Sequence, residues 1–165
     1  MDNKLSLSEP QQALSFATDL KNFITEKKLS TNIAGKDYIN VEGWQFAGMM
    51  MGLYPVVVEL ENLSRSEQIT TGGKSFLSKI YKFKATVELR DVRDNSVKGV
   101  GIAFCSNEEP MKRSFQEYAV ASMAQTRAVG KAYRNLLGFL VKAAGFESTP
   151  SEEMQELENI GKDIN

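Results

Sequence analysis

The sequence predicts an α+β fold, in which an antiparallel three-stranded β-meander packs against a long C-terminal helix and is preceded by an N-terminal helix and a small hairpin. Three observations support this prediction. Apolar residues recur at helical spacing near both ends of the 165-residue chain. Segments between these helical regions alternate apolar and polar residues, and turn-forming residues separate the segments.

The first third of the chain is predicted to form a helix, a hairpin and a second helix. Ser8 to Lys28 opens on a capping box and carries apolar residues at helical spacing, namely Leu14, Ala17, Leu20 and Ile24. Asn32 to Asn40 is expected to form a small hairpin that turns at Gly35 and Lys36. Val41 to Leu53 is expected to form an apolar helix, whose methionines suit irregular core packing.

Three segments in the middle of the chain are predicted to be the strands of the meander. These segments are Tyr54 to Leu60, Phe76 to Leu89, and Val97 to Cys105. The polar segment Ser64 to Lys74, which contains glycine, is expected to be a loop between the first two strands. Gly99 and Gly101 in the third strand mark a place where another backbone comes near.

The second strand of the meander has two chemically different faces. One face is expected to build the core and carries Tyr81, Phe83, Ala85, Val87 and Leu89. The other face carries Lys82 and Lys84 and is expected to meet solvent or a ligand.

Ser114 to Phe146 is predicted to be the long helix. At 100° per residue, a group of cations falls within about 80° of arc, namely Arg127, Lys131, Arg134 and Lys142. The opposite side is expected to pack on the sheet and carries Tyr118, Val129, Leu136 and Leu140. The helix therefore presents a basic stripe outward. Gly130 and Gly138 weaken the helix locally. Close approach of another backbone is one reason for glycine to occur at these two positions.

The formal charge of −1 hides a strong asymmetry along the chain. Residues 1–64 have a net charge of −3, residues 65–142 carry 14 basic and 7 acidic side chains, and residues 143–165 have a net charge of −5. A basic middle is expected where a chain meets a polyanion, although solvated faces can cluster in the same way. We divide the chain into a domain at 1–146 and an acidic tail at 147–165, which opens on a short helix after Thr149 and Pro150.

The composition argues against most enzyme classes. The chain has no histidine and one cysteine, so an internal disulfide is impossible and a Cys/His metal site has almost nothing to be built from. The segment from Gly72 to Ser75 does not complete a phosphate-binding loop, because Gln68 stands where that loop needs glycine. Acidic pairs such as Glu108 and Glu109 are expected to be solvated surface rather than a nuclease's magnesium site. We therefore expect a protein without catalytic residues, cofactor or metal, which is soluble and cytoplasmic.

Binding to a single-stranded nucleic acid is the chemistry that the residues favour. The stripe of the long helix, together with Lys79, Lys82 and Lys84, supplies cations that neutralise phosphates. Tyr81 and Phe83 lie on the opposite face from Lys82 and Lys84, so we expect these aromatic rings in the core. The pattern therefore predicts contact with the backbone rather than reading of bases.

With these elements in place, the chain resembles the Rad-fifty-two type of single-strand annealing protein, including its divergent phage members. The resemblance runs from the first helix to Gly138. It includes Ile33 to Gly43, similar to the family's hairpin that leads through a Glu-Gly pair into an aromatic-rich helix. It also includes Ala124 to Arg134, similar to a helix that carries a threonine, then a basic residue and alanine, then an arginine.

The resemblance implies a β-β-β-α core assembled into a homo-oligomeric ring, with single-stranded DNA held in a basic groove. It implies that Lys131 and Arg134 grip the strand, and the calculation of helix faces adds Arg127. Gly130 stands where the family has a further cation, which points to weaker binding or a shifted groove. Three readings follow: an ATP-independent annealing protein acting in recombination and repair, a protective single-strand binding protein whose acidic tail recruits a recombination partner, or a structural module whose basic helix is a subunit interface.

Overall fold

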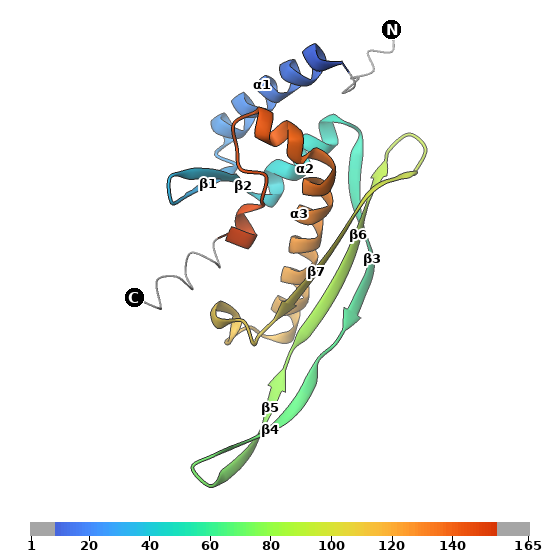
Figure 1. Cartoon of the computed structure of the whole chain (residues 1–165). Helices are drawn as coiled ribbons and strands as arrows, with labels where there is room; N and C mark the ends of the chain where they lie inside the picture. Colours follow the sequence, from blue (N-terminus) through green and yellow to red (C-terminus); the bar gives the residue numbers. More distant parts are fainter. Residues whose placement is uncertain (1–8, 155–165) are drawn as a thin grey trace.

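A three-stranded antiparallel sheet forms the centre of the structure, a computed structural model that describes residues 9–154 (Figure 1). Its strands are β3 (Leu53–Asn62), β6 (Lys82–Asp91) and β7 (Val97–Ser106), in the spatial order β3-β6-β7. Buried and half-buried residues alternate along β6. Its core face holds Phe83, Ala85, Val87 and Leu89. The predicted meander and the core face of its central strand are therefore confirmed.

Three helices complete the domain. The long helix α3 (Glu117–Ala143) lies across the inner face of β6 and β7, while α1 (Pro10–Lys27) and α2 (Val41–Met50) pack against its C-terminal part (Figure 1). The second half of α3 is consequently surrounded, and Tyr133 and Leu140 in it have no exposed surface. The predicted α+β class and the helix on the sheet are confirmed.

Helix α3 approaches β7 so closely that only glycine fits beneath it. A Cβ atom at Gly101 would collide with the carbonyl oxygen of Ala128 and with the backbone of Ala132. The absence of a side chain at this position therefore brings helix and strand backbones together, as the sequence predicts.

The N-terminal hairpin pairs β1 (Ser30–Ile33) with β2 (Lys36–Ile39), and a short 3₁₀ turn, η1 (Pro110–Lys112), leads from β7 toward α3. Ser8, where the first helix was expected to begin, lies outside the described residues, and Pro10 opens α1. Leu14 is 61% exposed, so the apolar face of α1 was partly wrong, whereas Ala17, Leu20 and Ile24 are buried as predicted.

The largest difference from the predicted fold lies at residues 64–80. The expected loop is a strand, β4 (Arg65–Thr71), which turns at Gly72 and Gly73 into β5 (Lys74–Ile80). The single long strand predicted at 76–89 is therefore two strands, β5 and β6, separated at Tyr81. Together β4 and β5 form a two-stranded hairpin, here called the arm, which projects beyond the end of the main sheet (Figure 1).

Two residues of α3 lie differently from the predicted helix faces. Tyr118, in the first turn of α3, was expected to pack on the sheet and is 78% exposed. Arg127 was expected to project outward, and its side chain is only 10% exposed.

Candidate nucleic-acid interface

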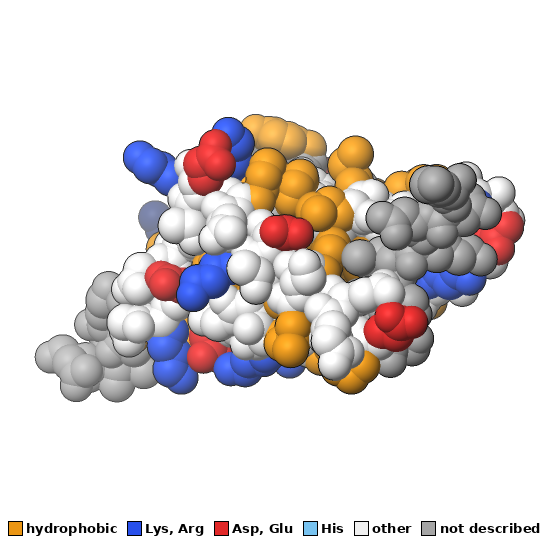
Figure 2. Space-filling view, turned by 90° about the horizontal axis from the view of Figure 1, so that it is seen from above, with side chains coloured by type: hydrophobic (Ala, Val, Ile, Leu, Met, Phe, Trp, Pro, Cys, Tyr) orange, Lys and Arg blue, Asp and Glu red, His pale blue; other side chains and the backbone are white. Residues whose placement is uncertain are grey.

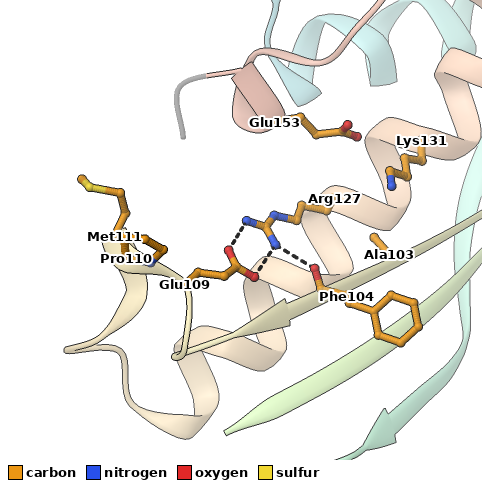
Figure 3. Close-up of a pocket in the computed structure, with 8 residues that line it drawn as sticks. All are labelled: Ala103, Phe104, Glu109, Pro110, Met111, Arg127, Lys131 and Glu153. Atoms are coloured by element: carbon orange, nitrogen blue, oxygen red, sulfur yellow. Dashed lines mark hydrogen bonds and ion pairs between the residues drawn. The ribbon is translucent and has the colours of Figure 1, made fainter. Parts of the chain in front are cut away.

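Arg127 is held inside the protein by an ion pair. Its Nη1 and Nη2 atoms donate to the two carboxylate oxygens of Glu109 at 2.9 and 2.6 Å, and Nη1 also donates to the backbone oxygen of Phe104 at 2.7 Å (Figure 3). A two-pronged guanidinium–carboxylate pair of this kind fixes both partners. Arg127 therefore ties α3 to the segment that follows β7, and its donors are directed away from solvent.

Lys131 lies one turn further along α3 and, unlike Arg127, lines a cavity without forming an ion pair with another described residue. Its side chain points into a cavity of about 280 Å³ between α3, the end of β7 and η1 (Figure 3). Glu109 and Glu153 also line this cavity. Among the described residues, none forms an ion pair with Lys131, which is half-buried.

Arg134 and Lys142 face carboxylates from the segment that follows α3. We call residues 147–154 the C-terminal strap. Glu153 lies 3.8 Å from Arg134, and Glu147 lies 3.0 Å from Lys142 and 4.0 Å from Lys36. The hydrogen bond from Lys142 lowers the pKa of Glu147 below its ordinary value, and the charges of Lys142 and Lys36 act in the same direction. The strap therefore neutralises part of the predicted basic stripe.

The strap is fixed to the domain by hydrogen bonds to the N-terminal hairpin and α2. The Glu147 N–H donates to the oxygen of Asp37, and the Val41 N–H donates to Oε1 of Glu152, both at 2.8 Å. The hydroxyl of Ser151, which is 1% exposed, lies 2.8 Å from Oδ1 of Asn40. The first eight residues of the predicted acidic tail are thus packed on the domain, and the rest of that tail lies outside the described residues.

Gly130 explains how the strap crosses α3. A Cβ atom there would lie 3.0 Å from Cγ of Pro150, which is tighter than ordinary packing. The close approach at Gly130 is therefore made by the ring of Pro150 and not by another backbone, and at Gly138 the nearest atom, Cβ of Ser148, would lie at an ordinary 3.7 Å, so the prediction of a backbone approach at these two glycines was wrong.

The predicted lysines of the sheet and arm also differ in their partners. Lys84 binds Glu61 at 2.7 Å and Glu59 at 3.3 Å, and these hydrogen bonds raise the pKa of its ammonium group. Lys79 places its Nζ atom 5.3 Å from the centre of the Tyr81 ring, which is half-buried rather than fully in the core. Lys79 and Lys82 form no ion pair with any residue in the described range 9–154.

The seven predicted cations therefore lie on different surfaces. Lys82 and Lys84 are on the outer face of β6, the face opposite to α3. Lys79 is at the base of the arm, and the other four are on α3. The face seen from above likewise shows basic and acidic side chains interspersed rather than separated into blocks (Figure 2).

The carboxylate partners of the cations were not recognised in the sequence. Glu109 lies 18 residues before Arg127, and no periodicity connects the two positions. Glu147 and Glu153 were assigned to a tail, although Gly130 marked the place where a segment crosses α3.

The described residues hold no group of three or more histidine, cysteine, aspartate or glutamate side chains placed to bind a metal. None of the helices in the described part of the chain is long and apolar enough to cross a membrane. Comparisons with known protein families, with curated proteins and with solved structures found no match to the chain.

Proposed function

We propose that the protein binds single-stranded DNA and anneals complementary strands without ATP, acting in recombination as a homo-oligomeric ring with a basic groove. The resemblance of Ile33 to Gly43 and of Ala124 to Arg134 to the Rad-fifty-two type supports this function. The order of the elements supports it too, because a three-stranded meander followed by one long helix is the core that the resemblance implies.

The observation that carries the proposal is the set of predicted cations that remain without carboxylate partners in the described structure. These are Lys79, Lys82 and Lys131. A lysine beside a carboxylate attracts a phosphate less strongly, because the carboxylate repels the same phosphate. Unpaired lysines gain the full contact and release the counterions that surround the phosphates.

A surface of fixed cations can assist annealing without forming or breaking a covalent bond. Two complementary strands repel each other through their phosphates, and fixed cations offset this repulsion. Base pairing then supplies the driving force. Neither a nucleophile nor a hydrolysed nucleotide is needed, which agrees with a chain that contains no histidine.

The small number of unpaired lysines requires several copies to act together. Three phosphate contacts give a slope of log affinity against log salt of about −2 for a single strand, so one protomer binds weakly at physiological salt. Copies arranged around a ring bind one strand jointly, and the effective concentration of each next site restores affinity.

The test uses two complementary oligonucleotides that carry a fluorophore and a quencher, mixed with the protein in a chelator and without nucleotide. We expect the protein to accelerate their pairing and to leave non-complementary pairs separate. Tight binding that slows pairing would instead support the protective single-strand binding protein. The absence of any salt-dependent binding to DNA would refute both functions and leave the structural module.

A further inference from the structure

The arm is exposed on both of its faces. Every residue of β4 is exposed, and so are the residues of β5 from Lys74 to Leu77. A two-stranded hairpin without a covering layer is at best marginally stable in water. The arm is therefore expected to contact another molecule when the protein functions.

Hydrogen bonds connect the base of the arm to the domain. Nη2 of Arg65 donates to Glu108 at 2.9 Å. The side chain of Asn107 donates to the oxygen of Lys79 at 3.2 Å and accepts from the N–H of Tyr81 at 2.9 Å. These bonds join the arm to the segment that follows β7.

One face of the arm combines an aromatic ring with a cation. Ile69 pairs directly with Phe76, and Thr71 pairs with Lys74, so these four residues share a face. The side chain of Phe76 is 53% exposed. Lys74 lies two positions away, which corresponds to about 7 Å along a strand. Lys74 has no ion pair with another described residue.

The rest of the arm is suited to a polyanion rather than to a protein core. Its one carboxylate, Glu67, is bound by Arg65 at 2.7 Å. Thr71 and Ser78 add hydroxyls, which commonly donate to phosphates, to the face that carries Phe76 and Lys74. The opposite face carries the polar side chains Ser66, Gln68, Thr70 and Ser75. Lys74 adds an unpaired lysine to the face of Phe76 near the tip of the arm, whereas Lys79 at the base lies on the opposite face.

We propose that this face of the arm binds the unpaired DNA strand, with the Phe76 ring stacked on a base and Lys74 bound to a neighbouring phosphate. The inference rests on the proposed function and adds a stacking contact to the contacts that the unpaired lysines make with phosphates. Stacking on an aromatic side chain tolerates any base, as annealing of arbitrary sequences requires.

The test measures the binding of a fluorescent oligothymidylate by anisotropy over a series of salt concentrations. We expect Phe76→Ala and Phe76→Leu both to weaken binding about tenfold with an unchanged salt slope, because leucine keeps an apolar side chain and loses the ring. Lys74→Gln is expected to reduce the magnitude of the slope by about 0.7. The matched control is Leu77→Ala, which alters an exposed apolar residue on the opposite face, 73% exposed against 53% for Phe76, and should bind as the wild type does.

Several outcomes would overturn the role of the arm. Wild-type affinity in Phe76→Leu would refute stacking, and equal losses in the Phe76 and Leu77 variants would refute the choice of face. A change of oligomeric mass in Phe76→Ala would instead make the arm a contact between copies of the chain. If the wild type itself shows no salt-dependent binding, the proposed function fails and the role of the arm fails with it.

Discussion

Arg127 and Lys131 lie one turn apart on α3 and hold their charges in different ways. The guanidinium of Arg127 is covered and bound to Glu109, whereas Lys131 opens into a cavity without an ion pair among the described residues. A buried pair contributes less than its Coulomb energy suggests, but removal of one partner leaves the other charge buried alone. We therefore assign Arg127 to the stability of the domain and, under the proposed function, expect Lys131 to contribute to binding.

Replacement of Arg127 by alanine is expected to destabilise the protein. The side chains of Arg127 and Glu109 are 10% and 29% exposed, so the loss in the free energy of unfolding should be about 3 kcal/mol. Urea denaturation followed by circular dichroism measures this loss.

The neighbouring pair of Arg65 and Glu108 provides the matched control. Arg65 is 44% exposed, so solvent screens its charge and Arg65→Ala should destabilise the fold much less. Equal and small losses in the two variants would contradict the structural role given to Arg127.

At the scale of the elements, contact between α3 and β7 depends on one glycine. Gly101→Ala would place a methyl group against the backbone of α3 at Ala128 and Ala132, where no side chain can rotate away. We expect a loss of about 2 kcal/mol in the free energy of unfolding, measured by urea denaturation.

Gly99→Ala is the control for this substitution, because a Cβ atom at Gly99 would meet its nearest neighbour at 3.5 Å, an ordinary contact. The close approach of helix and strand would be refuted if the Gly101 and Gly99 variants were equally stable.

The strap is the second element whose effect can be isolated. Its Glu147 and Glu153 compete with phosphates for Lys142 and Arg134. The double substitution Glu147→Gln and Glu153→Gln should strengthen binding of single-stranded DNA and increase the magnitude of the salt slope by up to about 1.4, which corresponds to two added contacts. Anisotropy of a labelled oligonucleotide measures both changes.

The control for the strap is Glu26→Gln, which removes a carboxylate from Lys27 on α1. Glu26 is 70% exposed, against 28% for Glu147 and 22% for Glu153. Glu26 should have no influence on the slope. Unchanged binding in the strap variant, with a wild type that does bind DNA, would mean that the strap holds the fold together and does not oppose the ligand.

For the molecule as a whole, periodicity in the sequence correctly predicted the core faces of single helices and strands. The alternation along β6 and the helical spacing in α3 identified the core, since each pattern follows from the geometry of a single element. The arm was missed because its polar strands bury almost nothing, although the Gly72-Gly73 pair between β-branched and aromatic residues is a hairpin signal. The ion pairs of Arg127 and Arg134 were missed because their partners come from other elements and no local pattern indicates them.

At the scale of the whole molecule, the proposed function depends on where the unpaired cations lie. Of the seven predicted cations, Arg127, Arg134, Lys142 and Lys84 are paired with carboxylates. Under the proposed function, we therefore expect binding to depend chiefly on Lys79, Lys82 and Lys131. These three lysines lie on the arm, the sheet and α3, and a strand that contacts all of them must pass over more than one element.

The most direct test of this account is the salt dependence of single-strand binding in a triple variant, Lys79→Gln, Lys82→Gln and Lys131→Gln. Because none of these lysines forms an ion pair with a carboxylate among residues 9–154, the variant should fold as the wild type does. We predict that the magnitude of the slope falls by about 2 for each bound protomer. A triple variant that keeps the wild-type slope and affinity would contradict the assignment of these lysines to the DNA backbone.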